Sequence, residues 1–259
     1  MTQFVDCGEA RIACDAVGAG PPLLLMHGAE ATRHMFADLL PHLTAHFRVI
    51  TYDQRDCGDT QAPPTPATLR QLAYDAHLLM RGLGLERAHV FGSSFGGRIA
   101  QALAALHPAS VNRLVLGSTW PLPHALAELN PQGAQQLAAL RSGLPQTAQA
   151  LATWFFPEPF LVERPALRDI FSAVRPASER SHRRALAVED RLEIDWSAVK
   201  APTLLLAGGL DRVVPPELTR GIASHLPGAE FALLDGVGHA TTLQAPGTVA
   251  QHLILFLAP

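Results

Sequence analysis

The sequence has few cysteines and little net charge, and each shortage excludes a class of protein. Its three cysteines, Cys7, Cys14 and Cys57, are an odd number with no framework spacing, and they form no ligand-spaced pair with histidines. We therefore expect free thiols in a reducing compartment. The net charge is −3, so no basic face predicts binding to nucleic acid and no polybasic segment predicts a membrane surface.

Long apolar runs are absent as well. The first residues, "MTQFVDCGEARIACDA", contain no basic stretch followed by an apolar one, so no secretory signal is predicted. No apolar run approaches the roughly 20 residues that span a bilayer. These absences predict a cytoplasmic protein.

What is present is a regular alternation of short apolar runs with helix-length segments. The 259 residues, 48% of them apolar, suit one ordinary domain with a large core. A hairpin-like start turns at Gly8, helical spacing runs from Met35 to Leu43, and Thr68 with Gln71 has the form of a capping box. Strands are expected within 21–28, 47–53, 89–92, 113–118, 201–209 and 230–236. The alternation predicts an α/β fold with a mainly parallel sheet covered by helices on both faces.

The alternation stops between about Trp120 and Ala198. This segment is rich in Ala, Leu, Gln, Arg and Pro, and it indicates several short helices. At about 80 residues it is too long for a plain connection. We expect a small helical cap, 120–198, inserted into a core formed by 1–119 and 199–259. Its aromatic residues either roof the substrate pocket or only pack the cap on the core: Trp154, Phe155, Phe156, Phe160 and Phe171.

The stretch "HVFGSSFGGRIAQALAALHP" carries the strongest functional signal. Gly92-Ser93-Ser94-Phe95-Gly96 fits G-x-S-x-G with an expected strand before it and a helix after it. In this motif the turn is so tight that only small residues avoid clashes two positions before and after the serine. The Ser94 hydroxyl is thereby exposed above a helix N-terminus. The other interpretation is a glycine-rich packing turn.

A serine nucleophile needs a general base and a group that orients this base. Asp211 follows the strand "APTLLLAGG", and His239 follows the last expected strand. With Ser94 they fall on one edge of the sheet, where open α/β sheets bind ligands. We expect His239 to accept the Ser94 proton and Asp211 to fix the histidine tautomer. Glu128 is an alternative acid, whereas Asp235 is interpreted as a turn former.

The loops beside these residues predict the remaining parts of a site. The backbone N–H of Phe95 and that of Ala29, after the turn at His27 and Gly28, are candidates for an oxyanion hole. We interpret His27 as structural. Asp53 and Arg55, which share the loop after the second core strand, are expected to form a structural ion pair.

Taken together, these segments resemble the α/β-hydrolase fold superfamily over nearly the whole chain. The resemblance is carried by "LLLMHGAEATRHMFADLLPHLTAHFRVITYDQRDCGDTQAP", "VFGSSFGGRIAQALAALHPASVNRLVLGST", "APTLLLAGGLDRVVPP" and "GVGHATTLQAPGTVAQHLILFL". Within the superfamily it is similar to the esterase, enol-lactonase and carbon–carbon bond hydrolase branch. The resemblance implies a Ser94–His239–Asp211 triad, an acyl substrate, and no metal or organic cofactor.

The sequence departs from the family pattern at two places near the site. The usual Arg-Gly-x-Gly-x-Ser loop reads Arg55-Asp56-Cys57-Gly58-Asp59-Thr60, which adds an acid near the base of the site. Gln244 replaces the usual Glu after the histidine, which we expect to change a structural contact only. The Ser-Gly-x-Gly run of ring-cleavage-product hydrolases is missing, and a serine nucleophile argues against haloalkane dehalogenases and epoxide hydrolases.

These features favour a serine hydrolase that cleaves a small carboxylic ester or lactone. The second hypothesis is a hydrolase of a C–C bond next to a ketone, using the same triad. The third is a ligand-binding homologue without activity, because a fold alone does not fix a function. The expected partner is a small-molecule substrate, with neither nucleic acid nor membrane, and the sequence predicts no oligomeric state.

Overall fold

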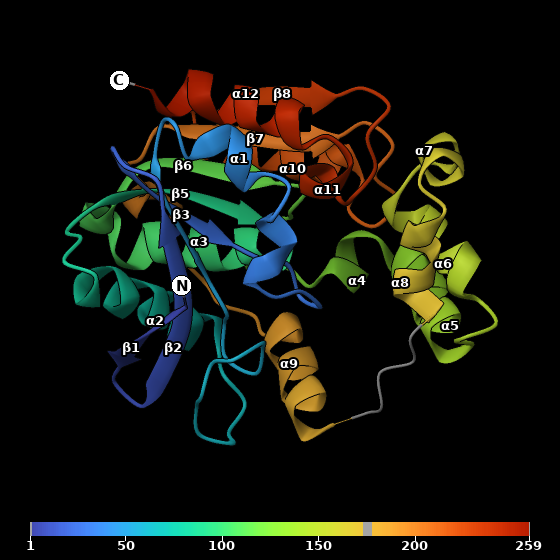
Figure 1. Cartoon of the computed structure of the whole chain (residues 1–259), viewed down its shortest axis with the longest axis horizontal. Coiled ribbons are helices and arrows are strands. Elements are labelled where there is room, and N and C mark those ends of the chain that lie inside the picture. Colours follow the sequence, from blue (N-terminus) through green and yellow to red (C-terminus); the bar gives the residue numbers. More distant parts are fainter. Residues whose placement is uncertain (1, 173–177, 259) are drawn as a thin grey trace.

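The computed structural model describes residues 2–172 and 178–258 and places a single eight-stranded sheet at its centre (Figure 1). The strands lie in the order β1-β2-β4-β3-β5-β6-β7-β8. The β1–β2 and β2–β4 pairs are antiparallel and all other pairs are parallel. The bounds are β1 Gln3–Cys7, β2 Ala10–Val17, β3 Pro22–Met26, β4 Arg48–Tyr52, β5 Ala88–Ser93, β6 Val111–Gly117, β7 Thr203–Gly208 and β8 Glu230–Leu234. The predicted fold class, an α/β fold with a mostly parallel sheet, is confirmed.

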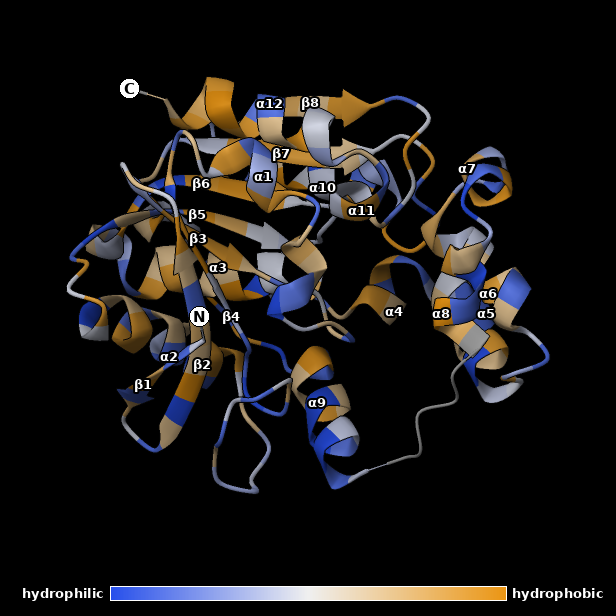
Figure 2. Cartoon of the chain, in the orientation of Figure 1, coloured by the Kyte–Doolittle hydropathy of each residue, from blue (hydrophilic) through white to orange (hydrophobic). Residues whose placement is uncertain are grey.

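Helices cover both faces of this sheet, which explains why its central strands lack polar alternation. Leu24 and Met26 of β3 belong to one core cluster and Leu23 and Leu25 to the other, and all four are fully buried. Full burial of each such side chain contributes about 1.5–3 kcal/mol. Figure 2 shows the apolar strands between the helices. One face carries α2 (Leu69–Gly82) and α3 (Phe95–Leu106), and the other carries η1 (Arg33–Phe36), α1 (Leu40–Leu43) and α12 (Pro246–Leu257).

The turn, the helix start and the helix predicted from local sequence patterns are present, with small differences. Gly8 has a φ of 64° in the β1–β2 turn. The Thr68 hydroxyl accepts the N–H of Gln71 at 3.1 Å, but the Gln71 side chain donates to Asp75 instead of completing the capping box. The expected helix from Met35 to Leu43 is divided into η1 and α1. Pro41 explains the division, because a proline ring clashes with the preceding helical turn and lacks an N–H.

Six α-helices lie between β6 and β7 in the described residues, and the described part of this segment contains no strand. They are α4 Leu126–Leu129, α5 Pro131–Ser142, α6 Ala148–Phe155, α7 Glu158–Glu163, α8 Ala166–Ser172 and α9 Glu179–Glu189. Figure 1 shows α5 to α8 grouped beyond the carboxyl ends of the strands, whereas α9 lies apart from them. The division of the chain into a core and a cap at residues 120 and 198 stays a prediction.

The chain after α9 returns along α3 to the start of β7. Arg98 of α3 is fully buried and donates to the carbonyl oxygens of Val188 at 2.7 Å and Asp190 at 3.0 Å. A cation at the end of a helix stabilises the unpaired carbonyls there. Arg98 therefore fixes the C-terminal end of α9 to the core. The remaining helices are η2 Pro108–Ser110, η3 Trp196–Ala198, α10 Pro216–Gly221, η4 Ile222–Ser224 and α11 Thr241–Gln244.

Two buried ion pairs hold the loop after β4, and they are not the pair expected from the sequence. Arg33 binds Asp53 and, at 2.9 Å, Asp59. Arg55 instead binds Asp75 of α2 at 2.5 and 3.0 Å. The predicted Asp53–Arg55 pair is wrong because the two side chains leave this loop toward opposite faces of the sheet. Among the described residues, no helix is long and apolar enough to cross a membrane.

Candidate active site

Ser94 lies at the junction of β5 and α3 in a backbone conformation that residues other than glycine rarely adopt. Its φ is 54° and its ψ is −120°. Such a conformation costs about 1–3 kcal/mol and persists only where its surroundings fix it. The N–H of Ser94 donates to the Gly117 oxygen at 2.8 Å, and its own carbonyl accepts the Thr119 hydroxyl at 2.7 Å. Ser94 thus lies at the centre of the strand–helix turn, at the position that the sequence predicted for it.

The glycines of the motif are required by close backbone approach. A Cβ on Gly92 would lie 2.4 Å from the carbonyl oxygen of Gly96. A Cβ on Gly96 would lie 2.1 Å from the carbonyl oxygen of Met26, at the end of β3. Neither position tolerates a side chain without movement of the backbone. The half-buried Ser94 side chain is therefore held at the carboxyl edge of the sheet, next to the β3 loop.

His239 and Asp211 converge on this serine as the sequence predicted. His239 Nε2 lies 3.1 Å from Ser94 Oγ, and His239 Nδ1 lies 2.8 Å from Asp211 Oδ2. The Asp211 side chain is fully buried. An ionised carboxylate only accepts hydrogen bonds, so Nδ1 carries the proton and Nε2 is free to accept the serine hydroxyl. This is the tautomer that a general base needs.

Backbone groups and one glutamine stiffen the two loops that present these side chains. Asp211 Oδ1 accepts the N–H groups of Val213 at 2.9 Å and Val214 at 2.8 Å. Gln244 accepts the N–H of Gly238 at 2.8 Å and donates to the Gly236 oxygen at 2.9 Å. The histidine loop is thus closed on itself by Gln244, the residue that departs from the family pattern.

The alternative acids do not reach the histidine. Glu128 accepts the N–H of Ala125 at 3.0 Å and pairs with Arg191 at 2.6 Å. It therefore caps α4 and contacts neither His239 nor Ser94. Asp235 is exposed in the turn after β8. Of the weighed carboxylates, only Asp211 contacts His239.

Within the described residues, no hydrogen-bond partner is found for the backbone N–H of Ala29 or for that of Phe95, and both residues lie near Ser94. Phe95 is the first residue of α3, whose N–H has no intrahelical acceptor. Ala29 follows Gly28, whose Cβ position lies 3.6 Å from Ser94 Cβ. Both groups are free to donate to an atom bound at the serine.

His27 fixes the turn that precedes Ala29. It is fully buried, and its Nε2 accepts the N–H of Gln54 at 3.2 Å. Nε2 therefore has no proton, and Nδ1 donates to the Gly28 carbonyl at 2.8 Å. Burial, aided by the nearby Arg184 charge, lowers the pKa of His27 to about 3. The ring stays neutral at ordinary pH, which agrees with the structural role expected of it.

The aromatic residues expected to line the pocket are divided between packing and the site. Phe155 places its ring edge-on to His239, with centroids 5.6 Å apart, and its carbonyl accepts the Ala240 N–H at 3.1 Å. Trp154 and Phe156 are only 6% and 2% exposed, within packed clusters. Phe160 stacks on Phe156 at 5.6 Å. Phe155 is thus the predicted aromatic residue that contacts the histidine.

Helix α9 packs against the unusual loop after β4. From the sequence, this helix was not connected with the site. Asp56 accepts Arg183 Nε at 2.9 Å and Nη2 at 2.6 Å, and both residues are partly buried. Arg184 donates from Nε to the Ala29 oxygen at 3.0 Å. A usable signal was present, because Arg180, Arg183 and Arg184 share one face of α9 at i, i+3 and i+4. That basic face is complementary to the acidic loop.

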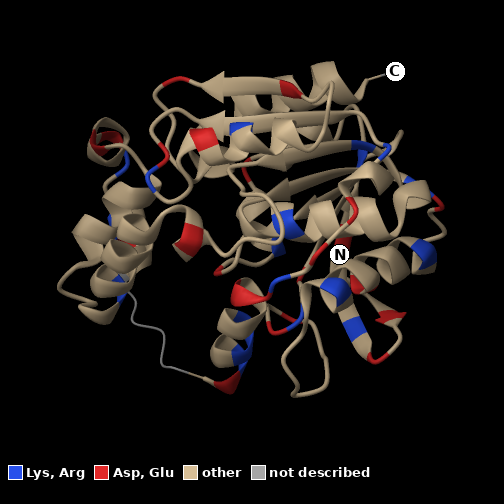
Figure 3. Ribbon diagram, turned by 180° about the vertical axis from the view of Figure 1, so that it is seen from behind, with Lys and Arg blue, Asp and Glu red and all other residues tan. Residues whose placement is uncertain are grey.

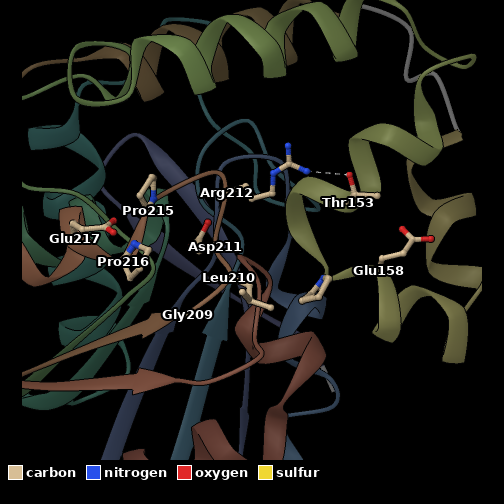
Figure 4. Close-up of a pocket in the computed structure, with 10 residues that line it drawn as sticks. Thr153, Glu158, Gly209, Leu210, Asp211, Arg212, Pro215, Pro216 and Glu217 are labelled. Carbon is tan, nitrogen blue, oxygen red and sulfur yellow. Dashed lines mark hydrogen bonds between the residues drawn. The ribbon is translucent and has the colours of Figure 1, made fainter.

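A pocket of about 500 Å³ lies behind the acid, between the loop after β7 and helices α6 and α7 (Figure 4). Asp211 forms part of its wall, but Ser94 does not. Arg212 crosses it, donating to the Thr153 hydroxyl at 3.4 Å and lying 4.5 Å from the Trp154 ring centroid. Because Ser94 does not line this hollow, it is not where an acyl group would meet the serine.

The neutral, buried His27 predicts a pH dependence of stability. In the unfolded chain this histidine takes up a proton below about pH 6.5, whereas in the folded chain it does so only near pH 3. The unfolded state therefore binds more protons in this window, so the free energy of unfolding falls as the pH falls. Urea unfolding of wild type and His27→Asn at several pH values between about pH 7 and about pH 5 measures how the free energy of unfolding depends on pH. The variant is expected to be less stable but to lose less stability on acidification, and equal slopes would contradict the assignment.

The chain is similar to known proteins over most of its length. Residues 21–153 match the family model described as alpha/beta hydrolase fold. The chain is 30% identical over 257 residues to a putative carbamate hydrolase RutD of Pseudomonas syringae pv. syringae, covering 95% of this chain and 96% of that protein.

Solved structures agree on the architecture. A thermophilic esterase from Thermogutta terrifontis superposes with a TM-score of 0.83 at 27% identity, covering 99% of this chain and 98% of the other. The enol-lactonase from Burkholderia xenovorans LB400 gives 0.83 at 23% identity over 99% and 100% of the two chains. At that identity the lactonase bears on the fold alone. The family model and the full-length relative together establish that this chain belongs to the alpha/beta hydrolase fold family.

Proposed function

We propose that the protein is a serine hydrolase that cleaves a small carboxylic ester or lactone through an acyl-enzyme. The observation that carries this proposal is the continuous chain from Ser94 Oγ to His239 Nε2 at 3.1 Å and from His239 Nδ1 to Asp211 at 2.8 Å. A serine hydroxyl becomes a useful nucleophile when a neutral, oriented imidazole accepts its proton. Family membership and the esterase among the solved structures support the same reaction type.

In this mechanism each group has one task. His239 removes the Ser94 proton while Oγ attacks the substrate carbonyl, and Asp211 stabilises the imidazolium that forms. The N–H groups of Ala29 and Phe95 receive the negative oxygen of the tetrahedral intermediate, and loss of one such donor costs about 10²–10³ in rate. His239 then protonates the leaving group. Water, activated by the same base, releases the acid in the second half-reaction.

Carbamates join esters and lactones in the proposed substrate class. The relatives described as putative carbamate hydrolases favour the inclusion of carbamates, whose carbonyl can be attacked by the same serine. The C–C bond hydrolase remains the second hypothesis, because it uses the same three residues. The missing Ser-Gly-x-Gly run after β3 counts against it.

A substrate panel separates these possibilities. Purified protein is offered p-nitrophenyl acetate and butyrate, a set of lactones, an aryl carbamate and a dienone acid. We expect turnover of the short esters or lactones because a nucleophile, its base and the acid that orients the base are the groups that acyl transfer needs. Turnover of the dienone acid alone would replace the proposed substrate class with the second hypothesis.

Removal of the nucleophile is the direct test of the mechanism. Ser94→Ala is expected to lower kcat by about 10⁴–10⁶, because triad residues act as a unit. Ser93→Ala is the matched control, since its side chain is buried beside the turn and is expected to have a far smaller effect. Peptide mapping after a fluorophosphonate probe gives the site of labelling. A label on Ser93 would mean that the nucleophile is misassigned.

The acid is tested by a charge-neutral variant. Asp211→Asn is expected to cost about 10³–10⁴ in kcat, since the amide favours the wrong imidazole tautomer. Glu128→Gln, which removes the other weighed acid, is expected to leave kcat unchanged. Both are measured on the same ester. A large loss in Glu128→Gln with near-normal turnover in Asp211→Asn would move the acid to α4.

A further inference from the structure

Helix α9 is attached to the loops of the candidate site by a row of arginines. Arg180 donates to the Gly58 oxygen at 3.1 Å, and Arg183 holds Asp56 as described above. Arg184 reaches furthest, into the β3 loop. Figure 3 shows charges of both signs along α9 and on the loops beside it. The first two arginines therefore account for docking of the helix, whereas the third needs a separate explanation.

Arg184 is a buried cation without a counter-ion. It is 6% exposed, and none of the ion pairs in the described part of the chain includes it. Its acceptors are the carbonyl oxygens of Ala29 at 3.0 Å and Gly28 at 3.4 Å, and the amide oxygen of Gln54. A buried, unpaired charge is costly. A role in simple docking does not explain why a charged group is kept here.

The acceptors of Arg184 determine where the Ala29 N–H points. In a trans peptide the carbonyl and the following N–H lie on opposite sides. The Gly28 oxygen faces Arg184 and His27, so the Ala29 N–H of the same peptide faces away from both. Gly28 itself lies against Ser94. Arg184 and His27 thus fix the direction of the Ala29 N–H by holding the carbonyl oxygen on the other side of the same peptide.

The same guanidinium also contacts the residue with the second free N–H. It lies over the Phe95 ring, 4.6 Å from the centroid, and a cation over an aromatic face is favourable in a desolvated setting. Gln54, its third acceptor, donates to the His27 oxygen at 2.8 Å and so braces the same turn. One side chain of α9 therefore contacts both residues that carry the candidate oxyanion donors.

We infer that Arg184 is a positioning residue that sets the Gly28–Ala29 peptide for stabilisation of the oxyanion. This inference rests on the proposed serine mechanism, and it assigns to α9 a part in catalysis that acts through main-chain groups. Arg141 of α5 holds the next residue, Glu30, at 3.1 Å, but both side chains are substantially exposed. Exposed pairs contribute little, so this contact does not replace Arg184.

The inference is tested with Arg184→Met and Arg184→Lys, with Arg183→Met as the matched control on the same helix. Steady-state kinetics on p-nitrophenyl acetate are combined with inhibition by phenylboronic acid, which forms a tetrahedral adduct with a serine nucleophile. Arg184→Met is expected to lower kcat and boronate affinity by the same factor, about tenfold to a hundredfold, with KM changed little. Acylation and deacylation use the same donors, so KM is preserved.

The control and the lysine variant separate positioning from folding. Arg183→Met is expected to lower the thermal midpoint but to keep kcat and boronate affinity within about threefold of wild type, because Asp56 contacts α9 and not the oxyanion loop. Arg184→Lys keeps the positive charge but lacks the planar guanidinium with its several N–H donors. It is therefore expected to retain part of kcat. If Arg184→Met does not fold, Arg184→Lys still tests the inference. A wild-type kcat and boronate affinity in Arg184→Lys would then overturn it.

Two results would reject the inference. One is a wild-type kcat and boronate affinity in a folded Arg184→Met. The other is an equal loss in Arg183→Met, which would assign the effect to docking of α9 as a whole. Failure of the proposed function looks different, because Ser94→Ala would then keep its activity and wild-type protein would not bind the boronate.

Discussion

The arrangement of the site depends on the contact between backbones at Gly92, Gly96 and the end of β3. A side chain at Gly96 would overlap the Met26 carbonyl, so strand β3, strand β5 and helix α3 meet there without intervening atoms. The loop that carries the candidate oxyanion donor Ala29 begins directly after Met26, and Ser94 lies between the two glycines. One steric constraint therefore sets the distance between Ser94 and the loop after β3.

Buried arginines at the carboxyl edge of the sheet fix the positions of the loops, just as the glycine contact fixes the positions of β3, β5 and α3. Arg33 and Arg55 hold the loop after β4 from the two faces of the sheet, and Arg184 holds the loop after β3. Buried ion pairs contribute little net stability when compared with apolar residues of the same size. Their contribution here is conformational, because loops at a site would otherwise have several backbone arrangements to choose from.

The parts of this structure that could be predicted from the sequence are those encoded locally. The apolar run at β3 and the glycines around Ser94 each specify their own conformation. Ser94, Asp211 and His239 each follow a parallel strand, which places them on one edge of the sheet. The contact between Arg184 and Ala29 joins residues 155 positions apart and has no local signature. The Asp53–Arg55 error has the same origin, since closeness in sequence does not indicate which face of the sheet a loop side chain will take.

The position of α9 has a consequence for recombination between family members. Strands β6 and β7 are parallel, so the chain that leaves at the carboxyl edge must return to the amino edge before β7 begins. Helix α9 opens this return and is already fixed to α3 by Arg98. A chimera that exchanges α4 to α8 and joins before α9 keeps the arginine contacts with the loops of the site. One that joins after α9 would also exchange α9 and so lose its arginine contacts with the loops beside Ser94.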